Sequence, residues 1–191
     1  MVDANGEWTG ILTFEDVLED IIGNVGDEFD PTRAGQFISL ADSLTPGRIF
    51  FQLRAQSMSE AIQNIIGRIP REVLPGDTQA ITEVVLKREQ AMPTYIGNGL
   101  AVPHGRFDGI DRPILAFARS DEGVPLEITN ERAELIFLLL TPSGRPRVQT
   151  RLLADITGLF HSEYVTDRLR KAQTPEAVIE AIRAGQEVAT D

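Results

Sequence analysis

The sequence contains no cysteine, and it has only two histidines, His104 and His161. The absence of cysteine excludes disulfides, thiolate metal sites and cysteine nucleophiles, and two histidines leave little for a zinc site. We therefore expect neither a metal nor another cofactor in this chain. The shortage of candidate nucleophiles directs attention to the two histidines.

The sequence also lacks a hydrophobic run long enough to cross a membrane. Its longest unbroken apolar run, residues 135–140, has the length of a strand, whereas a spanning helix needs roughly 20 residues. The first residues are acidic and do not resemble the basic start and apolar core of a secretory signal. We expect no direct membrane insertion of this chain and nothing that directs its export.

Positive charge is the scarcer sign in this protein. Eighteen Lys and Arg residues stand against 29 Asp and Glu residues, which gives a formal net charge of −11. Such a balance disfavours non-specific binding to nucleic acid and favours soluble or basic partners. With 191 residues, of which 42% are hydrophobic, the chain has the composition of one globular domain with an appendage.

The appendage is predicted at the N-terminus. A short strand-like segment, residues 10–12, precedes Thr13, which has the character of a helix N-cap. Apolar residues then recur at helical spacing up to Ile22, and Gly23 suits the C-terminal end of a helix. The acidic stretch that ends at Pro31 is a plausible linker.

The rest of the chain alternates between helical and strand patterns. Helices are expected over residues 37–44, 57–69, 77–89, 147–160, 163–172 and 174–184, and strands over residues 49–53, 94–96, 100–103, 113–119 and 133–140. The last of these strands is an uninterrupted apolar run, which suits a central strand covered on both faces. The predicted fold class is therefore α/β, with a mixed β-sheet sandwiched between helices.

His104 has the most informative setting in the sequence. It stands between Pro103 and Gly105 at the expected exit of a strand, and Gly97 and Gly99 come shortly before it. Glycine leaves the backbone bare, so that N–H groups can approach an anionic ligand. Arg88, at the end of the preceding helix, offers a forked donor set to phosphate oxygens. An isolated Pro-His-Gly is more often structural, and Arg88 alone equally suits a solvated helix end.

Several ordered motifs change this balance, because together they are similar to the type-2 IIA domains of the fructose, mannitol and nitrogen-related phosphotransferase systems. Arg88-Glu89 leads in register to a Gly-x-Ala-Val-Pro-His motif that ends at His104. Further similarities lie at residues 38–49, 135–142 and 165–177, so the resemblance covers about 150 residues. The expected IIA-like domain is residues 34–191.

The resemblance implies a phosphotransferase component that acts as a histidine phosphoryl carrier. His104 would accept a phosphoryl group from the phosphocarrier protein HPr, and Arg88 would stabilise the charge on the phosphoryl oxygens. Gly105 would bind or orient the same group. The implied downstream partner is a IIB component or a regulated transporter, and no metal or nucleotide is required.

One position departs from the family pattern. Members usually carry a second histidine at the start of the helix after the central strand, and Gln149 stands there in this chain. An amide can orient His104 or a phosphoryl oxygen but holds no proton charge. Gln149 as a mere surface residue is an equally good interpretation. His161 is expected at the surface, and Arg145, Arg147 and Arg151 are expected to form a solvated helix face.

Residues 1–33 resemble the last strand and helix of the CBS-domain pair in CorC-type membrane proteins, followed by a linker. This second resemblance leaves two functions open. The first is a phosphohistidine carrier that serves sugar uptake or regulation. The alternative is a regulatory interaction domain that does not transfer phosphoryl groups and is linked to a CBS-containing membrane transport protein. The expected location is the cytoplasm, either free or as the cytoplasmic part of a larger membrane protein.

Overall fold

The computed structural model describes residues 39–127 and 130–188. The predicted N-terminal appendage and its boundary at residue 33 lie outside these ranges. The helices are α2 (Leu40–Ser43), the 3₁₀ helix η2 (Pro46–Arg48), α3 (Met58–Arg68), α4 (Thr78–Ala91), α5 (Pro146–Leu159), α6 (Glu163–Lys171) and α7 (Pro175–Val188). The strands are β1 (Ile49–Phe50), β2 (Tyr95–Gly97), β3 (Leu100–Ala101), β4 (His104–Phe107), β5 (Ile114–Pro125) and β6 (Arg132–Pro142).

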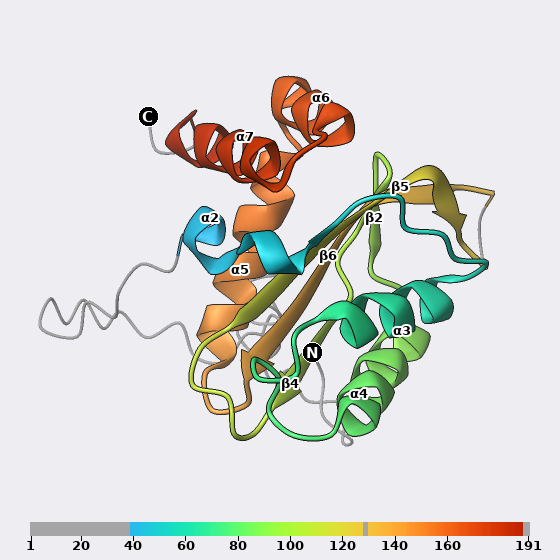
Figure 1. Cartoon of the computed structure of the whole chain (residues 1–191), viewed down its shortest axis with the longest axis vertical. Helices are drawn as coiled ribbons and strands as arrows, with labels where there is room; N and C mark the ends of the chain where they lie inside the picture. Colours follow the sequence, from blue (N-terminus) through green and yellow to red (C-terminus); the bar gives the residue numbers. More distant parts are fainter. Residues whose placement is uncertain (1–38, 128–129, 189–191) are drawn as a thin grey trace, which may run out of the picture. The chain divides into compact units, whose positions relative to one another are not determined.

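The strands form one mixed, six-stranded sheet with the order β1-β5-β6-β3-β2. β6 pairs antiparallel with β5 on one side. On its other side it pairs in parallel first with β3 and then with β4, which therefore follow one another along the same edge of β6. Helices lie on both faces of this sheet (Figure 1), so the predicted α/β sandwich is confirmed.

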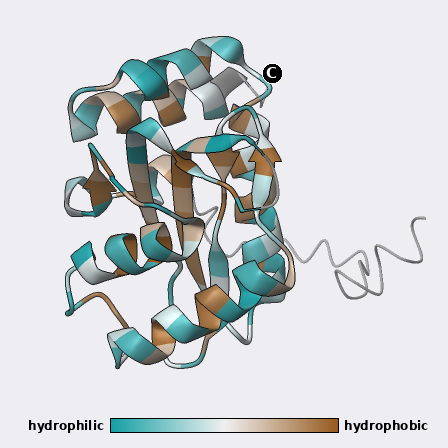
Figure 2. Ribbon diagram, turned by 90° about the vertical axis from the view of Figure 1, so that its right-hand side faces the viewer, coloured by the Kyte–Doolittle hydropathy of each residue, from teal (hydrophilic) through white to brown (hydrophobic). Residues whose placement is uncertain are grey.

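β6 is the central strand that its apolar run predicts. Leu135, Phe137 and Leu139 belong to the hydrophobic cluster shared with α2, α5, α6 and α7. Ile136 and Leu138 belong to a second cluster, shared with α3 and α4. Since successive side chains of a strand point to opposite faces, this one strand contributes to both halves of the core. Figure 2 shows the same arrangement, with hydrophobic residues along the inner strands and hydrophilic residues on the outer helix surfaces.

The helix boundaries follow the capping residues in the sequence. The hydroxyl of Ser57 accepts a hydrogen bond from the Glu60 N–H at 3.1 Å, and the carboxylate of Asp77 accepts one from the Gln79 N–H at 3.2 Å. The Thr174 hydroxyl accepts from the Ala177 N–H at 3.2 Å. These bonds satisfy N–H groups that have no partner within the first turn of a helix.

α4 buries a single narrow stripe of residues. Its inward face consists of Ile81, Val85 and Glu89, whereas the apolar Val84 is 41% exposed. Steps of four residues define this face, and Val84 lies about 100° around the helix from Val85. Glu89 is charged but buried, and it accepts hydrogen bonds from the N–H and hydroxyl of Thr94 at 3.1 and 2.6 Å. It thereby fixes the connection from α4 to β2.

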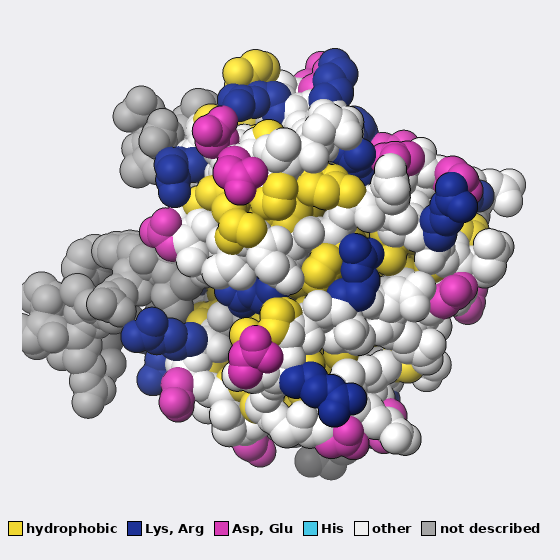
Figure 3. Space-filling view, viewed as in Figure 1, with side chains coloured by type: hydrophobic (Ala, Val, Ile, Leu, Met, Phe, Trp, Pro, Cys, Tyr) yellow, Lys and Arg dark blue, Asp and Glu magenta, His cyan; other side chains and the backbone are white. Residues whose placement is uncertain are grey.

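Charged groups of both signs are interspersed over the face of the molecule in Figure 3, and hydrophobic side chains gather across its upper middle. The net negative charge is therefore not spread as a uniform acidic surface on this face. Among the helices that the structure describes, none has the length and apolar character to cross a membrane.

Candidate functional site

His104 is the first residue of β4, which follows β3 along the same side of β6. The sequence predicted one strand that ends before His104, but the structure has a break at Val102-Pro103 and a new strand that begins with His104. The Pro103 carbonyl still accepts a hydrogen bond from the Leu139 N–H at 2.9 Å, while the Val102 N–H donates to the Thr94 carbonyl at 3.1 Å. Proline has no N–H to donate, which is why the regular ladder is interrupted here.

This break brings the Val102 carbonyl oxygen to the imidazole of His104. His104 Nδ1 lies 2.8 Å from that oxygen. A carbonyl oxygen only accepts hydrogen bonds, so Nδ1 must carry the proton of the neutral ring. The lone pair is therefore on Nε2, which is the nitrogen available for nucleophilic attack.

The surroundings keep the imidazole of His104 neutral. Burial, which leaves the residue 8% exposed, is the main cause that lowers its pKa below the ordinary value of 6.5. The hydrogen bond to Val102 acts in the opposite direction, and the positive charges of Arg88 and Arg106 lower the pKa further. At neutral pH the ring is thus an uncharged nucleophile within the electrostatic reach of two cations.

Arg88 lies in the last turn of α4, as the sequence predicts. Its Nη1 donates a hydrogen bond of 2.8 Å to the Met92 carbonyl, beyond the end of the helix. It is near enough to His104 for its charge to lower the pKa of the imidazole. The structure therefore brings the two residues predicted to act together into one site.

Arg106 belongs to the same site, although it was not among the predicted residues. It follows His104 by two positions on β4, and side chains two residues apart on a strand point to the same face. Its Nε donates to Gln149 Oε1 at 3.2 Å. The strand period, applied to His104-Gly105-Arg106, is the sequence signal that would have identified it.

Of the two interpretations of Gln149, the one that makes it a surface residue is wrong, because the side chain is buried. It lies in the first turns of α5 and is only 7% exposed. Besides the bond from Arg106, its Oε1 accepts one from the hydroxyl of Thr141, a fully buried residue at the end of β6, at 2.9 Å. Gln149 thus joins the helix after the central strand to the strand that carries His104.

Gly105 has a packing role that the sequence did not reveal. An added Cβ would lie 2.9 Å from a ring carbon of Phe107 and 3.2 Å from a methyl carbon of Val85. A side chain would therefore separate β4 from α4, the helix that carries Arg88. Its predicted part in phosphoryl binding stays a prediction.

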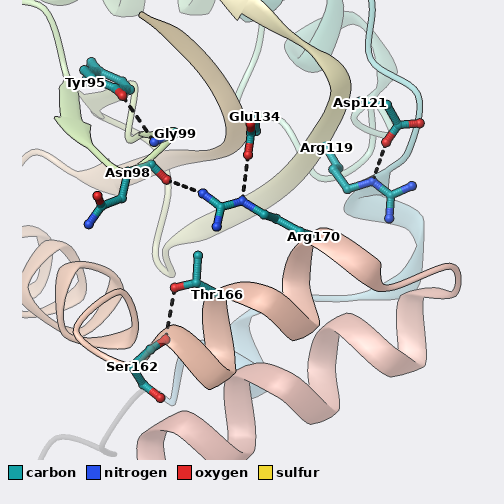
Figure 4. A network of polar contacts seen from close by, with 9 residues as sticks. All are labelled: Tyr95, Asn98, Gly99, Arg119, Asp121, Glu134, Ser162, Thr166 and Arg170. Carbon is teal, nitrogen blue, oxygen red and sulfur yellow. Dashed lines mark hydrogen bonds and ion pairs between the residues drawn. The ribbon is translucent and has the colours of Figure 1, made fainter.

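The other glycine pair lies elsewhere. Gly97 and Gly99 flank Asn98 in the turn between β2 and β3, and all three have positive φ angles of 97°, 77° and 51°, respectively. The Gly99 N–H donates to the Tyr95 hydroxyl at 3.2 Å (Figure 4). The Gly99 carbonyl accepts hydrogen bonds from the backbone N–H groups of Glu134 and Leu135, near the start of β6. The pair shapes this turn. The sequence had suggested that the pair belongs to the setting of His104, but it lies near the start of β6, whereas His104 pairs with Leu139.

A cleft of about 750 Å³ lies beside that turn, along α6, and most of the residues that line it are polar or charged. Each of its three cations faces a carboxylate: Arg170 lies 2.6 Å from Glu134, Lys171 lies 2.8 Å from Asp167, and Arg168 lies 3.9 Å from Glu180. The cleft therefore offers an anion little uncompensated charge.

Two further sequence predictions concern surface residues, and both are confirmed. His161 is exposed between α5 and α6. Arg145, Arg147 and Arg151 are exposed at and after the start of α5, and Arg151 is paired with Asp155 at 2.9 Å.

The fold and the site together define an α/β domain that presents a neutral imidazole next to two arginines. An uncharged nitrogen nucleophile between cations is suited to attack an anionic electrophile such as a phosphoryl group. The chain belongs to the family described as phosphoenolpyruvate-dependent sugar phosphotransferase system, EIIA 2, whose sequence model matches residues 42–185.

Curated relatives include both regulatory and sugar-transport proteins. A nitrogen regulatory protein of Pseudomonas aeruginosa is 33% identical over 146 residues, which cover 76% of this chain and 95% of that protein. The fructose-specific EIIABC component of Bacillus subtilis is 26% identical over 146 residues, which cover 76% of this chain and 23% of that longer protein. The chain is thus a phosphotransferase-system component of the IIA type, with a phosphocarrier or regulatory role.

Solved structures agree on the fold. The nitrogen regulatory protein IIA-Ntr of Neisseria meningitidis superposes with a TM-score of 0.68 at 24% identity, over 74% of this chain and 97% of that one. The mannitol IIA of Escherichia coli gives a TM-score of 0.63 at 24% identity, over 73% of this chain and 98% of that one. The same mannitol enzyme in complex with phosphorylated IIB gives 0.61 at 24% identity, over 74% and 97%.

Proposed function

We propose that His104 Nε2 accepts a phosphoryl group from an HPr-like phosphocarrier and holds it for onward transfer. The observation that carries this proposal is the hydrogen bond between His104 Nδ1 and the Val102 carbonyl, which leaves the lone pair on Nε2. In the step, the lone pair of Nε2 forms a bond to phosphorus as the bond between phosphorus and the donor's imidazole nitrogen breaks. The electron pair of the broken bond stays on the donor nitrogen.

Arg88 supports this step by its charge. Phosphoryl transfer spreads negative charge over three oxygens in the transition state, and catalysis consists mainly of positioning and electrostatic stabilisation. The Arg88 guanidinium is held at one nitrogen by the Met92 carbonyl, an uncharged group. Its charge is therefore available to the phosphoryl oxygens, in the role of a phosphoryl-binding residue.

The relatives support two kinds of onward acceptor. A mannitol IIA of similar fold has been solved with its phosphorylated IIB, which supports a IIB component as one acceptor. Several relatives are nitrogen regulatory proteins, which supports a regulatory target such as a transporter. Either role fits a cytoplasmic carrier domain over residues 34–191, preceded by a CBS-like remnant over residues 1–33.

A second function is a regulatory domain that binds its target without transferring phosphoryl groups. Gln149 favours it, because an amide holds no proton and supplies less electrostatic stabilisation than an imidazolium. This regulatory domain would belong to a CBS-containing membrane transport protein.

The test is the intact mass of the full chain after incubation with phosphoenolpyruvate, enzyme I and HPr. We expect a gain of one phosphoryl group that is lost in acid, absent from His104→Ala and retained in the matched control His161→Ala. If HPr becomes phosphorylated in the same tube and the wild-type mass does not change, transfer from this donor is wrong and the regulatory function is favoured.

A further inference from the structure

The amide of Gln149 has only one orientation that fits its neighbours. The Nε of Arg106 carries a hydrogen and never accepts, so the Gln149 atom 3.2 Å away must be the oxygen. The same oxygen receives the Thr141 hydroxyl at 2.9 Å. Both bonds fall on one atom of a buried side chain, and they fix Gln149 as an acceptor that faces Arg106.

The guanidinium of Arg106 is held at Nε alone. Within the described residues, its two terminal nitrogens form no hydrogen bond, and no carboxylate forms an ion pair with it. A guanidinium fixed in this way presents its outer edge, with both terminal nitrogens, to solvent. That edge matches two oxygens of a phosphoryl group.

The register of the sheet places this edge next to the reactive nitrogen. His104 pairs with Leu139 and Arg106 pairs with Thr141, so both side chains project to the face that α5 covers. Gly105, between them, projects to the opposite face, toward Val85 of α4. The charge of Arg106 is also near enough to affect the His104 imidazole.

We propose that Arg106 is a second phosphoryl-binding cation of this protein, and that Gln149 and Thr141 are the positioning residues that aim it at the group on His104. This inference rests on the proposed function of His104. It also explains why an uncharged residue at position 149 suits this site. A protonated histidine there would repel Arg106, whereas the amide oxygen attracts it without cancelling its charge.

A small phosphoryl donor separates this role from protein docking. Phosphoramidate transfers its phosphoryl group directly: the bond from phosphorus to its nitrogen breaks, ammonia leaves, and the bond to His104 Nε2 forms. We would measure initial phosphorylation rates by intact mass, with phosphoramidate and with phosphorylated HPr, for wild type, Arg106→Gln and the matched control Arg151→Gln. Arg151 is also exposed and on the same side of the sheet, but it is paired with Asp155.

We expect Arg106→Gln to slow both reactions by roughly 10- to 100-fold, the effect of one lost charge-assisted contact in a transition state. Arg151→Gln should stay within about twofold of wild type, as exposed ion pairs contribute little. If Arg106→Gln reacts normally with phosphoramidate and slowly with HPr, Arg106 is a docking contact and the proposal is overturned. If wild type reacts with neither donor, the proposed function of His104 fails instead.

The positioning role has a readout that needs no phosphorylation. An NMR titration of the His104 imidazole should give a higher pKa in Arg106→Gln than in wild type, because a nearby positive charge has been removed. Gln149→Ala should move the pKa in the same direction by a smaller amount, since the guanidinium is released and not deleted. If Gln149→Ala leaves both this pKa and the phosphorylation rate at wild-type values, Gln149 does not position Arg106.

Discussion

The two ends of β6 use arginine in opposite ways. Near its start, Arg170 binds Glu134 and the Asn98 carbonyl, and Arg119 binds Asp121 (Figure 4). Arg119 also donates to the Ala172 carbonyl. Roughly 13 Å further along the strand, beside the partner of His104, two arginines have only uncharged oxygens as hydrogen-bond partners among the described residues. Arg88 binds the Met92 carbonyl, and Arg106 binds the Gln149 amide.

The difference teaches how to separate a structural arginine from one that serves chemistry. At the first end, each guanidinium is paired with a carboxylate, on β6 for Arg170 and on its own strand for Arg119, so its charge is compensated within the fold. At the second end, the fold supplies orientation without compensation, so the charge is left for an anion that arrives from outside. The cations at the first end should therefore affect stability, and those at the second should affect phosphoryl transfer.

The largest expected effect is at the second end. Arg88→Ala should lower the rate of phosphorylation of His104 by roughly 100-fold, because removing one preformed donor from a charged transition state has effects of this order. Its stability should change by about 1 kcal/mol or less, since the bond lost is an exposed one to Met92. Rates by intact mass and unfolding in urea measure the two quantities.

Arg170→Ala is the matched control for Arg88→Ala. It removes an arginine of α6 that lies beside the other end of β6. The rate of phosphorylation of His104 should stay within about twofold of wild type. A fall in rate as large as that of Arg88→Ala would contradict the comparison, because the two ends would then be coupled.

A smaller effect, on stability alone, is expected for Arg119→Met. The Arg119 side chain is 7% exposed, lies 5.1 Å from the centre of the Phe51 ring and donates to the Ala172 carbonyl. Methionine keeps the apolar stem but leaves that carbonyl without its donor, which costs about 2 kcal/mol. Urea unfolding should show the loss, and the phosphorylation rate at 25 °C should not change. An unaltered unfolding midpoint would mean that water replaces the guanidinium at no cost.

The sequence was most informative where local pattern and tertiary role agree. β6 was predicted as a central strand because its apolar run has no polar face, and both halves of the core confirm it. The helix starts at Ser57 and Thr174 were predicted because caps act within one turn. Arg88 and His104 were predicted from a family motif, and the structure brings them together.

The parts that were missed depend on contacts that a helix or strand makes with residues outside itself. β4 is a strand because it pairs with β6, and nothing in His104–Phe107 alone shows this. Glu89 is buried because Thr94 supplies both of its donors. Gln149 is buried because Arg106 and Thr141 meet it from two strands. In the last two cases a polar side chain has a partner that its own helix does not contain.

The smallest expected effect concerns pH and stability. Burial lowers the pKa of His104 in the folded protein below the ordinary value of 6.5 that it has when unfolded. Between these two pKa values the unfolded state binds more protons, so stability falls as the pH drops below about 6.5 and stops falling at the folded pKa. His104→Gln has no titrating ring at this position. The unfolding free energy of wild type, measured relative to that of His104→Gln, should therefore fall from pH 7.5 to pH 5.

The pH dependence of stability also separates two causes that lower the pKa of His104, namely the charges at the second end of β6 and burial. Arg88 and Arg106 both lower the pKa of His104, although burial is the larger cause. In an Arg88→Gln and Arg106→Gln double variant, the acid-dependent loss of stability should therefore shrink but persist. If the loss vanishes, the two cations and not burial keep His104 neutral, and the site depends on them before any phosphoryl group arrives. If the loss is unchanged, the cations lie too far from His104 to bind a group on its Nε2, and the contrast between the two ends of the strand is wrong.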